Sequence, residues 1–185
     1  MDQKEKLSGL TVALHWLVGL SIIGMLVMGI YMHNNEVWAW YPLHKSLGVL
    51  VLVFVLIRVV WRLKNGWLPP AAEATPAATK LAKTVQGLLL LLTLTLPLSG
   101  MIGSGMGGYG VPFFGVDLIP MNFSETEPDK IVAHSEATME VASAVHELGA
   151  LALIILIIIH LLAALKHHFI GKNGTLLRML GKRIK

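Results

Sequence analysis

Residues 142–169 read ASAVHELGALALIILIIIHLLAALKHHF, and this stretch decides the fold of the chain. It has no charged residue between Glu147 and Lys166, and helical residues rise about 1.5 Å each, so it is long enough to cross a hydrocarbon core of about 30 Å. A lone strand is excluded because it would leave backbone groups in lipid without hydrogen bonds. We therefore expect a membrane-spanning helix, whose start can reach back to near Lys130.

Three further apolar stretches of similar length precede this one. The chain of 185 residues is 55% hydrophobic and 14% charged, whereas a soluble domain has about a quarter charged residues. So much apolar surface needs lipid as its solvent. We predict an all-α, integral membrane four-helix bundle that forms a single transmembrane domain over residues 1–185. The expected spans are residues 8–31, 41–63, 81–104 and 142–169.

Lysine and arginine are distributed unevenly between the two sides of these spans. Of the 15 basic residues, only Lys45 and Lys130 lie on the side that holds the loop between spans one and two. Basic residues beside short loops stay on the cytoplasmic side, so we expect both termini to be cytoplasmic. The net charge of +4 then reflects topology and attraction to lipid headgroups rather than nucleic-acid binding.

Two features bear on other classes of site. The chain has no cysteine, which excludes disulfides, thiolate-bound iron–sulfur clusters and covalently attached c-type haem. The glycine-rich segment 99–110 resembles a phosphate-binding loop, but no strand precedes it and no Gly-Lys-Ser/Thr follows it. We expect this segment to be a flexible outer loop.

Four histidines lie inside the expected spans, where ionisable groups are costly and indicate function. A single one would more often be an interhelical hydrogen-bonding group, but four at matching depths favour a shared role. Spans one and two run in opposite directions, so His15 lies toward the inner side and His44 toward the outer side. On span four, His146 lies toward the outer side and His160 toward the inner side. Depth therefore pairs His15 with His160, and His44 with His146.

The spacing on span four indicates two cofactors. The 14 positions from His146 to His160 rise about 21 Å and return to nearly the same helix face. Small residues lie three or four positions from each histidine, which gives either close helix approach or room for a flat macrocycle. We favour the macrocycle. These small residues are Gly19, Gly48, Gly149, Ala163 and Ala164.

Paired imidazoles favour haem over other metal centres. Zinc sites usually need three or four converging ligands, and the sequence contains no such cluster. Two opposed imidazoles suit low-spin haem iron, and filled axial positions favour electron transfer over oxygen binding. We expect two b-type haems. The axial ligands would be His15 and His160 for the inner haem, and His44 and His146 for the outer haem.

The other histidines lie outside these pairs. His33 and His134 fall in outer segments and are expected to be solvated. His167 and His168 follow His160 at the inner interface, where they either extend to water or hydrogen-bond a quinone carbonyl. They are candidates for a quinone site.

Short motifs along the chain resemble the bacterial cytochrome b561 family. They include Leu14-His15-Trp16-Leu17, His44-Lys45-Ser46-Leu47-Gly48, Arg58-x-x-Trp61-Arg62, Leu96-Pro97-Leu98-Ser99-Gly100, His146-Glu147-Leu148-Gly149 and the runs His160–Phe169 and Lys172–Met179. The resemblance covers nearly the whole chain and is nearest to the superoxide oxidase type, a di-haem protein of the bacterial inner membrane. It implies b haem ligation at the four paired histidines and ubiquinone as the electron acceptor.

Two features depart from that type. Span three has Lys83 and Gln86 where the superoxide oxidase type has histidines, so an interfacial role there is not carried over. The outer side has Lys45 and Lys130 against eight carboxylates, a net charge of −6 that does not favour steering of an anion such as superoxide. Because screening confines each charge to about 8 Å, Lys45 beside His44 remains the expected docking point for the donor.

Three functions follow as alternatives. The first is a superoxide:ubiquinone oxidoreductase, with superoxide or another small outer-side donor. The second is an electron conduit and anchor subunit of a dehydrogenase or hydrogenase complex, although the short loops favour an autonomous protein. The third is a metal or haem transporter, which would be expected to place charges at mid-membrane, and the span centres have none. The expected partners are membrane lipid, ubiquinone and superoxide or an unidentified donor, with no nucleic acid.

Overall fold

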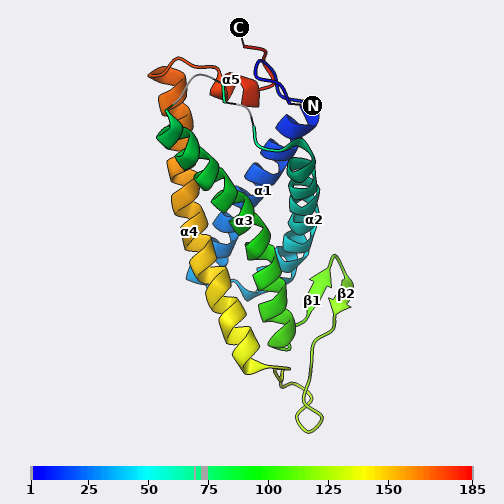
Figure 1. Ribbon diagram of the computed structural model, residues 1–185. Helices are drawn as coiled ribbons and strands as arrows, with labels where there is room; N and C mark the ends of the chain where they lie inside the picture. The colour runs from blue at the N-terminus through cyan, green and yellow to red at the C-terminus, as the bar shows by residue number, and fades with distance from the viewer. Residues whose placement is uncertain (1, 69, 72–74, 185) are drawn as a thin grey trace.

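The computed structural model describes residues 2–68, 70–71 and 75–184. Within them, four long helices run side by side in alternating directions, and each is long and apolar enough to cross a membrane (Figure 1). This arrangement confirms the predicted all-α four-helix fold. The helices are α1 (Gly9–Asn34), α2 (Tyr41–Asn65), α3 (Pro76–Met106) and α4 (Glu136–Phe169).

The two ends of the bundle differ in structure. At the first, called the terminal end, the two termini lie close together and the short helix α5 (Thr175–Met179) lies beside them (Figure 1). Toward the opposite end, called the hairpin end, strands β1 (Val111–Phe113) and β2 (Val116–Ile119) pair as an antiparallel hairpin. The 3-10 helix η1 (Trp38–Trp40) also lies there, between α1 and α2.

Hydrogen bonds join the two termini at the terminal end. Because the partners are far apart in sequence, these bonds fix the first and last segments of the chain against each other and against α1. They run from Ile184 N to the Glu5 carbonyl (2.9 Å), from the Arg178 guanidinium to the Lys4 carbonyl (2.9 Å) and from Trp16 Nε1 to the Met179 carbonyl (2.7 Å).

Side-chain caps begin three of the long helices described here. Each cap hydroxyl accepts a hydrogen bond from a backbone N–H of the first turn, which otherwise has no partner inside the helix. Pro76 follows one of these caps and fixes the backbone angle that a first helical residue needs. The caps are Ser8 to Thr11 N (3.2 Å), Thr75 to Ala78 N (3.2 Å) and Ser135 to Thr138 N (3.3 Å).

The observed helix bounds differ from the predicted spans most at α3 and α4. Helix α3 begins at Pro76, five residues before the predicted start at residue 81, because the Thr75 cap lies there. Helix α4 begins at Glu136, between residue 142 and the earliest start considered, near Lys130. Both extensions lie at helix ends, where polar residues lengthen a helix beyond its apolar run.

The glycine-rich segment 99–110 is helical as far as Met106, so the prediction of a flexible loop was wrong for most of its length. A β-carbon added at Gly103 would lie 3.3 Å from Ser143 Oγ on α4. Small residues here let α3 approach α4 closely, which is a common basis of helix association in membranes. The glycines inside the helix, such as Gly103, therefore serve packing rather than flexibility, whereas Gly108 and Gly110 after it have positive φ angles.

The hairpin was not predicted, because strands of three and four residues are too short to show an alternating pattern. Its turn uses Phe114 and Gly115, whose φ angles are +47° and +93°. Ser46 of α2 contacts the hairpin: its hydroxyl accepts from Phe114 N (3.1 Å), and its proton is shared between the carbonyls of Pro42 (2.8 Å) and Pro112 (3.2 Å). The start of α2 and the hairpin are thereby joined.

A small apolar core joins the four long helices near the middle of the bundle. The most extensive helix contact is between α3 and α4, whereas α1 and α4 have no comparable backbone contact in the described residues. Most outward-facing apolar side chains are exposed, as expected for a surface that faces lipid. The core residues are Val18, Ile22, Val51, Val55, Leu96 and Leu153.

Candidate functional site

The structure brings the four span histidines together as two pairs at different depths. His15 on α1 faces His160 on α4 toward the terminal end, with ring centres 6.2 Å apart. His44 on α2 faces His146 on α4 toward the hairpin end, with ring centres 6.5 Å apart. All four side chains are half-buried. Helix α4 contributes one imidazole to each pair.

A backbone carbonyl fixes the tautomer of His146. Its Nδ1 lies 2.9 Å from the Leu96 carbonyl oxygen, and since a carbonyl only accepts, Nδ1 carries the proton. The Ser99 hydroxyl also donates to this oxygen (2.9 Å). Nε2 of His146 therefore keeps its lone pair, which is the arrangement that metal-binding histidines use.

Glycine on α3 lets this contact form. A β-carbon at Gly100 would lie 3.0 Å from His146 Cε1 and 3.1 Å from its Nδ1, which is closer than such contacts normally come. The Leu96 carbonyl and Gly100 are one helical turn apart and lie on the same face of α3. The imidazole thus rests directly on the backbone of α3.

His15 has a different neighbour. Nδ1 of His15 lies 3.3 Å from an Nη atom of Arg58 on α2. A guanidinium has only donors, so Nδ1 is the acceptor in this contact. Nδ1 of His146 therefore contacts a neutral carbonyl, whereas Nδ1 of His15 contacts a positively charged guanidinium.

His44 has a buried ring nitrogen without a partner. Its Nδ1 is enclosed, and no hydrogen bond reaches it within the described part of the chain. A buried polar atom without a partner costs about 1–3 kcal/mol. Gly29 of α1 lies beside the same ring, since a β-carbon there would be 3.5 Å from His44 Cε1.

Both pairs fit a metal-centred group held between two imidazoles. Ring centres 6.2 Å and 6.5 Å apart leave room for one metal ion between the two imidazoles of each pair, since imidazole nitrogens bind metals such as zinc at about 2.0–2.1 Å. Among the described residues, no group of three or more histidine, aspartate or glutamate side chains is placed to hold a metal ion. A β-carbon at Gly19, near His15, would meet nothing within 4 Å. The donor set of each pair, two imidazoles in a largely apolar setting, suits the iron of a b-type haem.

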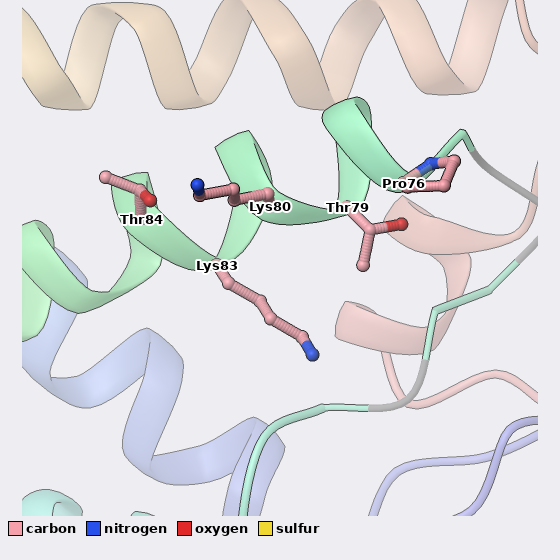
Figure 2. Close-up of a pocket in the computed structure, with 5 residues that line it drawn as sticks. All are labelled: Pro76, Thr79, Lys80, Lys83 and Thr84. Atoms are coloured by element: carbon pink, nitrogen blue, oxygen red, sulfur yellow. The ribbon is translucent and has the colours of Figure 1, made fainter.

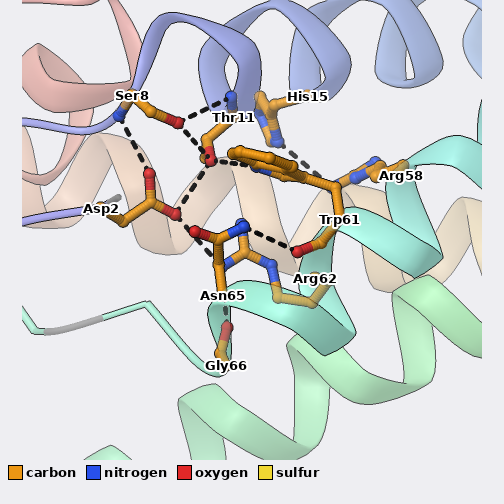
Figure 3. Close-up of polar contacts among 9 residues, drawn as sticks. All are labelled: Asp2, Ser8, Thr11, His15, Arg58, Trp61, Arg62, Asn65 and Gly66. Atoms are coloured by element: carbon orange, nitrogen blue, oxygen red, sulfur yellow. Dashed lines mark hydrogen bonds and ion pairs between the residues drawn. The ribbon is translucent and has the colours of Figure 1, made fainter.

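A polar network lies beside the His15 pair at the terminal end (Figure 3). Trp61 Nε1 donates to Thr11 Oγ1 (2.7 Å), which donates to the Asp2 carboxylate (2.9 Å). Asp2 also accepts from Ser8 N (2.9 Å) and pairs with Arg62 (3.5 Å). Burial alone would raise the pKa of Asp2, but these hydrogen bonds and the Arg62 charge together lower it below 3.8.

The other predicted site residues lie apart from the two pairs. Lys45 is not a free cation, because its ammonium donates to the carbonyls of Tyr109 (2.9 Å) and Gly110 (3.2 Å). His167 is exposed at the terminal end, with Nδ1 3.0 Å from the Asn173 amide nitrogen. The ring of His168, half-buried, packs edge-on against Phe169, with centres 4.8 Å apart. The predicted roles of Lys45 in donor docking and of His167 and His168 in quinone binding therefore stay predictions.

Lys83 lines an open pocket at the start of α3 rather than either histidine pair. The pocket, of about 570 Å³, is shown in Figure 2, where its residues lie on successive turns of the helix. Its lining residues are Pro76, Thr79, Lys80, Lys83 and Thr84.

Arg58 and the Leu96 carbonyl are site features that the sequence reasoning missed. A signal for Arg58 was present: it is a charged residue within span two, at the depth expected for His15. No side-chain pattern marks the Leu96 carbonyl, although the adjacent Pro97 lies at the same turn of α3.

Comparison with known proteins gives a consistent result. A family model described as prokaryotic cytochrome b561 matches residues 6–182. Cytochrome b561 homolog 2 of Escherichia coli (strain K12) is 32% identical over 183 residues, covering 96% of this chain and 93% of that protein. A probable superoxide oxidase CybB of Yersinia pestis is 29% identical, covering 97% and 98% of the two chains. Cytochrome b562 of Cereibacter sphaeroides is 27% identical, covering 99% and 100%.

Proposed function

Because this chain belongs to the prokaryotic cytochrome b561 family, whose members transfer electrons in membranes through b-type haem, we propose that it holds two such haems. One would lie between His15 and His160, the other between His44 and His146. Haem iron with two imidazole ligands exchanges single electrons and has no open position for oxygen. The observation that carries the proposal is the pair of facing imidazoles at each of two depths, 6.2 Å and 6.5 Å between ring centres.

The distribution of charge supports an orientation in the bacterial inner membrane. Thirteen of the 15 lysines and arginines belong to the terminal-end side, and basic residues beside short loops remain cytoplasmic. In this orientation both termini and α5 are cytoplasmic, and the hairpin end faces outward. The His44 pair is then the one that an external donor reaches first.

Superoxide is the proposed donor, and ubiquinone the proposed acceptor. The similarity to the Yersinia pestis relative, a probable superoxide oxidase, supports the donor. Two superoxide anions each release one electron and become dioxygen, and one ubiquinone takes both electrons with two protons to become ubiquinol. His167 and His168, at the terminal end, are the proposed contacts for the quinone carbonyl. Lys45 is the proposed docking point for superoxide.

A second candidate function rests on the charge of the hairpin end. This end has two basic residues, Lys45 and Lys130, and eight carboxylates. Lys130 already pairs with Glu127 at 2.9 Å. A surface of net charge −6 attracts a cationic protein more readily than an anion. This favours the alternative of an electron conduit that receives electrons from a protein donor, as part of a dehydrogenase or hydrogenase complex.

Stopped-flow reduction of the purified, haem-loaded protein by superoxide separates these candidates. The proposed function requires two acid-extractable protohaems per chain, rapid reduction by superoxide and formation of ubiquinol at one per two superoxide consumed. His44→Ala should abolish rapid reduction while the other haem remains. Two haems that superoxide does not reduce at any salt concentration would contradict the superoxide donor and favour the conduit. Fewer than two haems per chain would contradict the proposal as a whole.

A further inference from the structure

The two histidine pairs differ in the charge placed next to them. On the His15 pair, the guanidinium of Arg58 lies 3.3 Å from a ring nitrogen. On the His44 pair, the corresponding contact to His146 is the neutral Leu96 carbonyl. The ring contacts of the two pairs therefore differ in charge, while the ammonium of Lys45, which follows His44, donates to the carbonyls of Tyr109 and Gly110.

Arg58 differs from the neighbouring arginine in its contacts within the described residues. Arg62, one turn later on α2, pairs with Asp2 at 3.5 Å and donates to the Gly66 carbonyl at 2.9 Å. Among the described residues, no aspartate or glutamate lies within ion-pair distance of Arg58, and its side chain is half-buried. Such a charge inside a membrane-spanning helix is costly to retain and indicates a function.

The geometry also limits what Arg58 does when a metal binds. If His15 binds iron through Nε2 as a neutral ring, its proton moves to Nδ1, and Arg58 can no longer donate there. Because Arg58 lies in α2 beside His15, its positive charge remains within one side-chain length of this pair.

We propose that Arg58 raises the redox potential of the haem held by His15 and His160 above that of the haem held by His44 and His146. This inference rests on the proposed two-haem function. A nearby cation favours the form of a redox centre that carries one more electron, and a half-buried charge is only partly screened. Electrons that arrive at the hairpin end are thereby drawn toward the terminal end. Arg58 is thus a positioning residue that sets the direction of transfer.

Spectroelectrochemical titration of the purified di-haem protein tests this inference. The two spectral components are assigned with His44→Ala, which keeps only the terminal-end haem, and with His15→Ala, which keeps only the other. In wild type, the component assigned to the terminal end should have the higher midpoint. Arg58→Gln should lower that midpoint and leave the second unchanged, whereas Arg58→Lys should keep most of the wild-type value.

Arg62→Gln is the matched control, because it removes the same unit of charge one turn farther from His15. If Arg62→Gln shifts the midpoint of the terminal-end haem less than Arg58→Gln does, the result supports a short-range effect of Arg58. Equal shifts of both haems in Arg58→Gln, no shift, or a shift to higher potential would overturn the inference. If Arg58→Gln loses its terminal-end haem, the midpoints of the wild-type protein still test the inference. A wild-type terminal-end haem with the lower midpoint would overturn the inference. A protein with fewer than two haems would instead contradict the proposed function.

Discussion

At the scale of single residues, the two α4 histidines have separate partners, although they share a helix. His160 faces α1 and His146 faces α2, and each facing pair has its own polar contact. The two pairs therefore have no side chain in common, so their side chains are independent of each other.

This independence predicts the spectra of histidine variants. His15→Ala and His160→Ala should each lose the same haem and leave the same residual reduced-minus-oxidised spectrum. His44→Ala and His146→Ala should share a different residual spectrum. Haem extraction from each variant provides the count, which should fall from two to one per chain. Different residual spectra for His15→Ala and His160→Ala would show that the pairing is wrong.

Asp2 gives a residue-scale prediction about pH. Its carboxylate accepts from Ser8 N and Thr11 Oγ1 and pairs with Arg62, so Asp2→Asn should destabilise the protein at pH 7 by about 1–3 kcal/mol. Its pKa is lowered on folding, so this stabilisation is complete above 3.8 and is lost as pH falls through the lower folded value.

Thermal unfolding in detergent across pH measures this effect. The difference between wild type and Asp2→Asn should be constant from pH 7 to about 5 and shrink below 3.8. Glu125 is an exposed carboxylate at the hairpin end, so Glu125→Gln serves as the control. Its thermal stability should differ little from that of the wild type across the same pH range. A difference that grows on acidification would contradict the assigned role of Asp2.

At the scale of elements, the contact between α3 and α4 depends on glycine. Gly100 lets the His146 ring rest on α3, and Gly149 faces Leu96, whose Cδ1 would lie 2.9 Å from an added β-carbon. The ring of His146 is rigid, whereas the end of Leu96 is flexible. Substitution at Gly100 is therefore the more disruptive of the two for the histidine pair.

Gly100→Ala should selectively weaken haem binding at the hairpin end. The new methyl group would displace the His146 ring from the Leu96 carbonyl, and overpacking of this kind costs about 1–3 kcal/mol. Haem content per chain and the residual spectrum, which should match that of His146→Ala, are the measurements. Gly24→Ala is the control, since it is exposed and its β-carbon would meet nothing within 4 Å. Loss of the terminal-end haem in Gly100→Ala would count against this explanation.

Much of the element scale could be predicted from the sequence, because lipid imposes a simple rule on hydropathy and length. The four helices follow from that rule, and the depth of each histidine follows from alternating helix directions. The rest depends on how helices rotate about their axes and where short polar segments fold. The Arg58–His15 contact, the Leu96 carbonyl and the hairpin belong to this second group: the sequence places Arg58 at the depth of His15, but it does not place the guanidinium against that ring.

At the scale of the whole molecule, the basic terminal end predicts the topology. The chain contains no cysteine, so single cysteines can be introduced as accessible labels without background. Glu125→Cys, exposed near the hairpin end, should react with a membrane-impermeant maleimide in cells whose outer membrane is permeabilised. Lys182→Cys, exposed at the terminal end, should react only after the inner membrane is broken. The reverse pattern would invert the proposed orientation.

The contribution of α4 to both histidine pairs also has a consequence for biosynthesis. A nascent chain that has inserted α1, α2 and α3 already carries His15 and His44, but it lacks both of their partners. Under the proposed function, an incomplete chain cannot enclose either haem between two imidazoles. Under this proposal, ligation of either haem by two imidazoles has to wait until the last span has entered the bilayer.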